Sequence, residues 1–373
     1  MKVQKESTSV ITLAIQKWAR NPSFKPLYYN YWNLIMNIIN PETAEVWDVA
    51  KSSKTIPVID FAKTQETAFL ANEIGNACKE WGFFQVVNHG ISTETMRTLW
   101  DCTHNFFSLP KNQKRYLNRT SENPWGYFDQ ELTKNKRDKK EIFDIGPKVD
   151  TSMLDSQDPF TGVTPWPETQ PVFKTTMQEH FKTCETLSLK IMEAICVSLG
   201  LENRHLEKCF YPHHTSFLRL NYYPVVDPLA DIDKDDKEDA GLGVHHHTDS
   251  GAVTILCQDN IGGLQVFKDN YWLPIEPIND ALVINIGDMI QVWSNGKYKA
   301  AMHRVVAMEK VDRYSIPFFL NPSYETIVSP FTNNNEKSAY HSINWGDFRR
   351  KRADGDYADV GKEIQISDYL IQS

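Results

Sequence analysis

From about Thr215 to about Asn321, short apolar runs with a period of two alternate with turn residues. A period of two puts successive side chains on opposite faces of a strand, so this region predicts a series of short β-strands. Strands that follow one another without intervening helices close into a barrel or a jelly roll. We therefore expect a mainly β core.

The residues before this region predict a different organisation. Two short apolar runs predict strands, and three amphipathic segments predict helices. These elements are expected at residues 56–61, 66–81, 83–87, 92–108 and 179–199. Gly200 ends the last helix, because glycine readily adopts the conformation that follows helix C-termini. Helices should therefore flank the β core.

The charge balance argues against nucleic acid as a partner. The chain carries a formal net charge of −8, whereas phosphate binding needs a positive surface. The basic run at residues 134–140 (KNKRDKK) contains Asp138 and is followed by Glu141. We expect this run to be a solvated loop or helix face, and the acidic stretch at residues 227–239 to be a solvated loop.

The composition also indicates the compartment. No stretch approaches the roughly 18 consecutive apolar residues of a membrane span, and the N-terminus shows no targeting signal. Six cysteines are scattered without a close pair, which favours reduced thiols over disulfides or a zinc site. We expect a cytoplasmic protein with no membrane partner.

Residues 217–224 (FLRLNYYP) predict a strand with one polar face. Alternation puts Arg219, Asn221 and Tyr223 on the same side as Phe217. This face either meets solvent or lines a barrel interior that holds a polar ligand, and the segment alone does not decide between these two readings.

A candidate metal site follows. His247 and Asp249 are two residues apart, so in a strand they share a face and can converge on one cation. His303, in the apolar pattern AAMHRVV, is the candidate third ligand. Two histidines and one carboxylate on one face of an octahedral metal are associated with non-haem Fe(II) oxygenases. Zinc hydrolysis would use a similar ligand set.

Arg313 separates these two chemistries. It lies ten residues after His303, and Ser315 follows on the same strand face. The planar guanidinium binds a carboxylate at two points, and a neighbouring hydroxyl adds a third hydrogen bond. Taken singly, His303 could be a buried structural histidine and Arg313 a surface arginine. The order of the motifs on successive predicted strands favours the iron site.

At these residues the chain resembles the isopenicillin N synthase-like family of Fe(II)- and 2-oxoglutarate-dependent dioxygenases. The resemblance covers about residues 55–325. Its N-terminal part is carried by IPVIDF and WGFFQVVNHGI, and its C-terminal part by NYYP, HTDSGAVTILCQD, GGLQV, NIGDM, SNGKYKAAMHRV and RYSIPFF.

The resemblance implies a double-stranded β-helix, or jelly roll, with flanking α-helices. It implies that His247, Asp249 and His303 bind the iron and are the catalytic residues. Arg313 and Ser315 would hold the distal carboxylate of 2-oxoglutarate, and Asn221 and Tyr223 would contact the same co-substrate.

The implied reaction consumes O2 and 2-oxoglutarate, releases succinate and CO2, and oxidises a small organic substrate. Hydroxylation is the expected outcome, although demethylation, desaturation and ring closure belong to the same chemistry. Ascorbate is a candidate reductant, and we expect a monomer.

The resemblance also divides the chain. Residues 1–54 form an N-terminal extension of unknown role and residues 55–180 an N-terminal dioxygenase region. Residues 181–214 form a helical connection to the dioxygenase core at 215–325. The tail at 326–373 either covers the barrel mouth or contains an exposed helix.

Three other functions remain open. An iron oxidase of the same fold would keep Arg313 and Ser315 without using 2-oxoglutarate. A non-catalytic barrel could bind a metal or small ligand, because fold does not dictate function. A cupin-like protein could add His245 as a ligand, which would leave Arg313 and Ser315 without a role.

The pocket and the histidine run give two further expectations. Pocket residues are expected from residues 125–128, Phe143, Phe217 and Phe319, which favours an apolar or aromatic substrate. His245 lies roughly 13 Å from Asp249 along an extended strand at ~3.3 Å per residue, too far to bind the same ion. His246 should point away from the metal.

Overall fold

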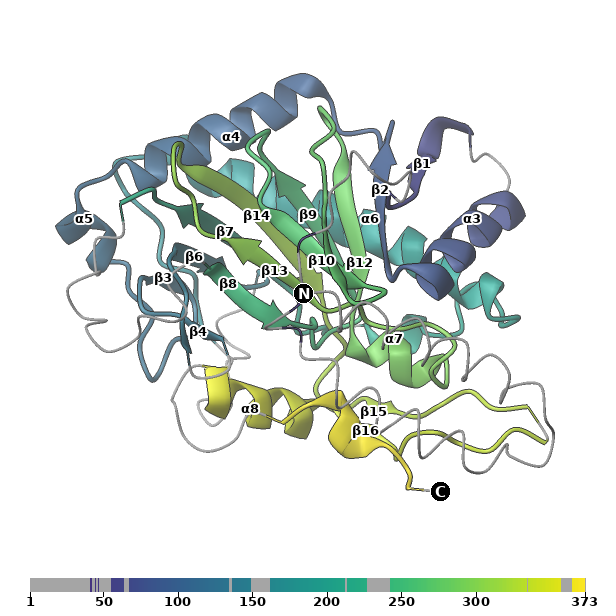
Figure 1. The fold of residues 1–373 in the computed structure, drawn as a ribbon. Coiled ribbons are helices and arrows are strands. Elements are labelled where there is room, and N and C mark those ends of the chain that lie inside the picture. Colours follow the sequence, from purple (N-terminus) through teal and green to yellow (C-terminus); the bar gives the residue numbers. More distant parts are fainter. Residues whose placement is uncertain are drawn as a thin grey trace, which may run out of the picture.

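Two β-sheets form the core of the computed structural model (Figure 1). The structure describes residues 41, 44, 46, 55–63, 67–133, 136–148, 162–211, 213–226, 242–333, 335–356 and 364–372. The large sheet contains, in spatial order, β1 (Val58–Asp60), β2 (Phe83–Val87), β12 (Leu282–Ile286), β9 (Val253–Gln258), β14 (Arg313–Leu320), β7 (Phe217–Tyr223), β6 (Glu141–Ile145) and β3 (Gly126–Phe128). The small sheet contains β11 (Tyr271–Pro274), β10 (Leu264–Lys268), β13 (His303–Val306) and β8 (Leu242–His247). The expected mainly β jelly roll with flanking helices is confirmed.

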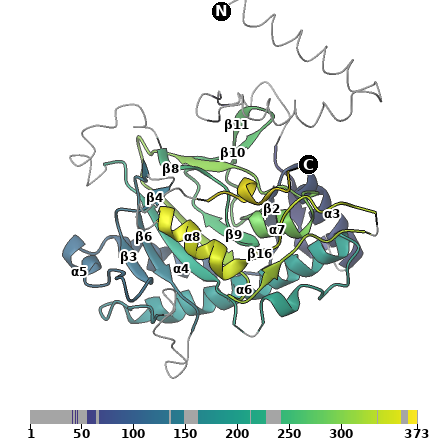
Figure 2. The same cartoon turned by 90° about the horizontal axis from the view of Figure 1, so that it is seen from below.

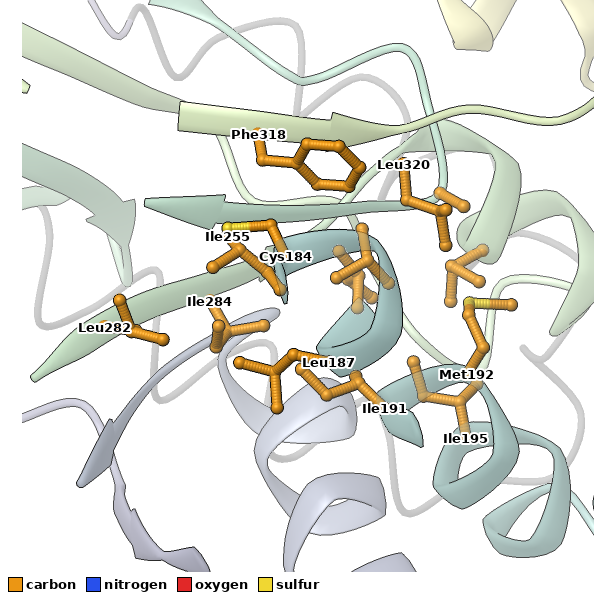
Figure 3. Packing of buried hydrophobic residues seen from close by; sticks show 14 of the residues in the cluster. Cys184, Leu187, Ile191, Met192, Ile195, Ile255, Leu282, Ile284, Phe318 and Leu320 are labelled. Carbon is orange, nitrogen blue, oxygen red and sulfur yellow. The ribbon is translucent and has the colours of Figure 1, made fainter. Parts of the chain in front are cut away.

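Three helices cover the outer face of the large sheet: α3 (Thr67–Glu80), α4 (Thr93–Phe107) and α6 (Pro171–Ser198). In α6, buried Cys184, Leu187 and Ile191 recur at helical spacing and pack against the apolar face of the sheet. Figure 3 shows these side chains beside Ile255 and Phe318. The helices therefore shield one face of the sheet and leave its other face for the barrel interior.

The helix ends follow local chemistry. The Ser92 hydroxyl caps α4 by accepting a 3.1 Å hydrogen bond from the Thr95 backbone N–H. Gly200 has φ +77° after α6, as expected. The start of α6 differs from the prediction by eight residues, because Pro171 occupies the first turn, where its missing N–H costs nothing. The boundary we expected after residue 180 falls inside this helix.

The basic run was predicted wrongly. Lys140 is 7% exposed and Asp138 is fully buried, so the described part of this run is not a solvated loop. The Lys140 ammonium lies 3.0 Å from the Asp138 carboxylate, and this neutralisation permits burial of both groups. The short strand β4 (Leu132–Thr133) precedes the run, and β5 (Lys136–Arg137) lies within it.

The C-terminal tail packs against the barrel. Its helix α8 (Trp345–Asp356) lies beneath the sheets in Figure 1 and is seen from below in Figure 2. Trp345 and Phe348 are fully buried, so this helix is not a free surface helix. The remaining short elements are η3 (Phe61–Lys63), α5 (Lys111–Arg115), η5 (Glu207–Cys209), α7 (Asp288–Trp293), β15 (Ile327–Val328), β16 (Ile343–Asn344) and η6 (Ile366–Tyr369).

Other expectations can be compared with the described residues. All six cysteines carry free thiols, as predicted. Within the described ranges, the helices are too short or too polar to cross a membrane. The acidic stretch at 227–239 and most of the extension at 1–54 lie outside the described residues.

Candidate metal and co-substrate site

His247, Asp249 and His303 converge inside the barrel. His247 ends β8, His303 begins β13, and the two residues face each other in the ladder between these strands. Asp249 Oδ1 lies 3.6 Å from Nε2 of each histidine. Within the described part of the chain, this is the one group of three histidine, cysteine or acidic side chains whose ligand atoms lie within 4.8 Å of one another. The spacing suits three ligands on one side of a cation.

Both imidazoles are oriented by backbone carbonyls. His247 Nδ1 lies 2.8 Å from the His245 carbonyl oxygen, and His303 Nδ1 lies 3.1 Å from that of Ala301. Each Nδ1–H donates to its carbonyl, which leaves the Nε2 lone pair directed towards Asp249. Burial, followed by the neighbouring His247, lowers the pKa of His303 to about 4, so its imidazole is neutral at pH 7.

The Asp249 carboxylate is held by two neighbouring side chains. Its Oδ2 accepts hydrogen bonds from Thr254 Oγ1 at 2.5 Å and Asn285 Nδ2 at 2.7 Å, while Oδ1 faces the histidines. Burial raises the pKa of Asp249, but His303, His247 and Asn285 together outweigh burial and hold that pKa well below its usual range. The site thus combines the Asp249 anion with the Nε2 atoms of two imidazoles, of which His303 is neutral at pH 7.

The other two histidines of the run lie elsewhere. His245 is 5% exposed, and its Nδ1 lies 3.2 Å from Asp138 Oδ1. The His246 ring lies 6.4 Å from the Trp272 ring on β11. The geometry therefore separates His247 from its two neighbours, as expected from strand alternation for His246 and from distance along the strand for His245.

Arg313 occupies the same cavity with part of its guanidinium uncommitted. It is 1% exposed, and its Nε donates a 2.6 Å hydrogen bond to the Gly262 carbonyl. Its Nη1 is buried without a hydrogen-bond partner among the described residues. A buried unsatisfied donor is costly, so this nitrogen points to a missing acceptor such as a carboxylate.

The other expected co-substrate residues surround Arg313. Ser315 and Asn221 face each other across β14 and β7, and Asn221 Nδ2 donates to Ser315 Oγ at 3.3 Å. The Tyr223 ring lies 4.8 Å from the Arg313 guanidinium carbon. Asn221 Oδ1 is a second buried polar atom without a partner in the described chain. The unpartnered Arg313 Nη1 and the neighbouring Ser315 hydroxyl are donors that fit one carboxylate of a small dicarboxylate beside the triad.

The cavity walls combine apolar and charged groups. Arg219, Asn221 and Tyr223 line the cavity, which decides that the polar face of β7 faces inward. Lys140 lies in the same wall. The apolar lining of the cavity is formed by Phe83, Val244, Leu256, Leu264, Val305, Pro317 and Phe319.

The aromatic prediction was only partly right. Phe319 lines the cavity, and Phe217 stacks on it with the ring centroids 4.6 Å apart. Phe143 instead packs against Phe106 and Phe173 of the outer helices. Asp144, next to Phe143 in β6, reaches Arg219 on the cavity side, so alternation turns Phe143 to the helices.

Sequence reasoning missed Lys140, because the charged run around it suggested solvent exposure. Arg219 forms two hydrogen bonds with Asp144, at 2.7 and 2.8 Å, and a third with Glu131 at 2.9 Å. Asp144 therefore faces the cavity, and Lys140, four residues earlier, falls on the same face of an extended chain. Strand alternation was thus the available signal that Lys140 faces inward.

Comparison with known proteins agrees with this geometry. Residues 214–322 match the model of the 2OG-Fe(II) oxygenase superfamily, and residues 56–169 match the non-haem dioxygenase N-terminal model named for morphine synthesis. The chain is 35% identical to the bi-functional coumaroyl CoA and feruloyl CoA ortho-hydroxylase Diox4 of Ruta graveolens, over 79% of this chain and 78% of that protein. It belongs to the 2OG-Fe(II) oxygenase superfamily.

Further relatives of the dioxygenase show the range of its superfamily. The chain is 35% identical to a 1-aminocyclopropane-1-carboxylate oxidase of Musa acuminata, over 74% of this chain and 85% of that one. The crystal structure of JOX2 in complex with 2OG, Fe and JA superimposes with a TM-score of 0.70 at 27% identity, covering 86% of this chain and 90% of JOX2. This protein is therefore a 2-oxoglutarate-dependent dioxygenase that uses Fe(II).

Proposed function

We propose that His247, Asp249 and His303 are the iron ligands and catalytic residues of this dioxygenase. The observation that carries the proposal is the convergence of their three ligand atoms beside an arginine whose buried Nη1 has no partner in the described chain. Arg313 and Ser315 bind the distal carboxylate of 2-oxoglutarate, and Asn221 and Tyr223 contact the same molecule.

The protein's own residues position the reactants. When bound, Fe(II) and 2-oxoglutarate supply the oxidation of substrate by O2, with release of succinate and CO2. Asp249 contributes the negative charge of the ligand set, while the two histidines keep their protons on Nδ1. The guanidinium of Arg313 fixes the co-substrate by charge and by hydrogen-bond direction. The apolar walls exclude water from the reacting atoms.

The substrate we propose is a small, largely apolar molecule that is hydroxylated. The apolar lining supports its hydrocarbon part. The inward-facing Lys140 supports a hydrogen-bond acceptor on the same molecule, such as a carboxylate or carbonyl oxygen. A screen of small acids, each paired with its methyl ester, tests both parts by substrate-dependent succinate release.

Two alternatives have direct outcomes in the same assay. An iron oxidase of the same fold that does not consume 2-oxoglutarate would form product without stoichiometric succinate. A non-catalytic barrel would bind metal without turnover of any substrate. Either outcome would contradict the proposed function.

We further propose a cytoplasmic monomer with ascorbate as reductant and no nucleic-acid partner. The net charge of −8 and the six free thiols support this setting. Light scattering of the purified protein tests the monomer, and turnover with and without ascorbate tests the reductant. The division at residues 54, 214 and 325 also remains our proposal.

A further inference from the structure

The backbone between the proposed ligands His247 and Asp249 is held by residues of α7 and α8. Strand β8 ends at His247, so Thr248 and Asp249 lie beyond its ladder. The Asp249 carbonyl accepts a 2.8 Å hydrogen bond from the Asp288 backbone N–H at the start of α7. The Thr248 carbonyl accepts a 3.0 Å hydrogen bond from Arg352 Nη2 of α8.

Arg352 connects three parts of the protein. Its Nη1 donates a second 3.0 Å hydrogen bond to the Ile364 carbonyl in the tail that follows α8. Its charge also acts on the buried Asp288 carboxylate. The residue is only 6% exposed. A buried guanidinium with this many fixed contacts has little freedom to move, so it can hold the peptide to which it donates.

We propose that Arg352 is a positioning residue for iron binding, which holds the Thr248 peptide and thereby the relative placement of His247 and Asp249. This inference rests on the proposed ligand assignment. Because Asp249 comes two residues after the end of β8, its side-chain direction depends on the path of the Thr248 peptide. Residues that orient metal ligands typically contribute 10- to 100-fold to metal affinity.

Helix α8 contains a matched control. Arg349 lies one turn earlier, is 9% exposed, and donates a 2.8 Å hydrogen bond to the Thr215 carbonyl before β7. It anchors the same helix to the segment before β7, whereas Arg352 binds the segment after β8. Arg350 is a second control, since its side chain is 53% exposed and pairs with Asp347.

The test is a metal titration of the full-length protein. The apoprotein is titrated with Mn(II), and the electron paramagnetic resonance signal of the free ion measures how much metal remains unbound. A second titration uses Fe(II) under anaerobic conditions. We expect Arg352→Met to weaken binding of both metals by about 10-fold or more. Arg349→Met should lower the melting temperature to a similar extent while changing metal affinity by less than about twofold, and Arg350→Met should change neither.

A conservative variant separates positioning from general stability. Arg352→Lys keeps the charge but can reach only one of the two carbonyls, so its metal affinity should lie between those of wild type and Arg352→Met. At saturating Fe(II), the Michaelis constant for 2-oxoglutarate should be unchanged in Arg352→Met. If Arg352→Met does not fold, the metal affinity of Arg352→Lys tests the inference. We expect Arg352→Lys to bind metal at least about threefold more weakly than wild type.

The inference is overturned if Arg352→Met, or Arg352→Lys in its place, binds metal as tightly as wild type. It is also overturned if Arg349→Met weakens binding equally, because the effect would then come from loosening the whole helix. His247→Ala in the same titration distinguishes this failure from a wrong ligand assignment. Metal retained by His247→Ala would reject the assignment itself.

Discussion

Asn285 Nδ2 lies 2.7 Å from Asp249 Oδ2, on the side of the carboxylate turned away from the two histidines. Asn285 is 3% exposed and comes from β12, 36 residues along the chain. Asn285 and Thr254 both donate hydrogen bonds to Oδ2, so Oδ1 of Asp249 remains directed towards the Nε2 atoms of the two histidines. The metal site thus depends on residues outside the ligand motif.

Replacing Asn285 with Ala should therefore weaken metal binding by about 10-fold to 100-fold, because Asp249 loses one of two orienting donors. Titration with Mn(II) measures this loss. Asn321→Ala is the control, since Asn321 is equally buried and donates to the Thr215 carbonyl instead. Equal weakening in both variants would assign the effect to stability.

Replacing Arg313 with Lys should raise the Michaelis constant for 2-oxoglutarate by about 10-fold or more. An ammonium cannot reproduce the planar fork, and hydrogen bonds to charged groups contribute about 1.5–3 kcal/mol each. Arg304→Lys is the control, because Arg304 lies on β13, the preceding strand along the chain, but binds Gln265 and the Trp272 ring. An unchanged Michaelis constant in Arg313→Lys would contradict the proposed role.

The histidine run allows a three-way comparison. Iron should be lost from His247→Ala and retained by His246→Ala, whose native ring lies near Trp272. His245→Ala should retain iron but destabilise the fold, because buried Asp138 loses a hydrogen bond. Iron content of the three purified variants measures this. Loss of iron from His246→Ala together with retention of iron by His247→Ala would mean that the strand register, and with it the ligand assignment, is wrong.

The sequence predicted those parts of the site that depend on local alternation. His247 and Asp249 share a side because they are two residues apart, and the same rule predicted one polar face for β7. Whether that face meets solvent or the barrel interior was decided only by the structure, which turns it inward. Contacts between distant segments were not predictable in this way. Nothing near Asp249 indicates that Asn285 will hold it, or that Arg352 will reach Thr248 from the tail.

Burial of charge was the other source of error. A run of lysines normally indicates solvent, and the fold reverses this at Lys140 by placing Asp138 3.0 Å from its ammonium. Similarly, Phe143 appeared suitable for a substrate pocket by residue type alone. Its strand parity sends it to the helices, where Phe106 and Phe173 cover it.

His180 gives a pH prediction that is independent of the metal. It lies on α6, is 3% exposed, and its Nε2 contacts the thiols of Cys184 at 3.4 Å and Cys257 at 3.8 Å. Burial, with a smaller contribution from His89, lowers the pKa of His180 from 6.5 to about 4. Between these values the unfolded chain binds a proton that the folded protein does not, so stability falls as the pH falls from 6.5 towards 4.

At pH 5 this proton should cost the folded state about 2 kcal/mol relative to pH 7.5, since each unit of pKa shift corresponds to about 1.4 kcal/mol. His180→Leu removes the titrating group and fills the same buried position with an apolar side chain. Urea unfolding of both proteins at the two pH values measures the difference. Wild type should lose about 2 kcal/mol more than His180→Leu on acidification, whereas an equal loss would mean that His180 is protonated in the folded protein.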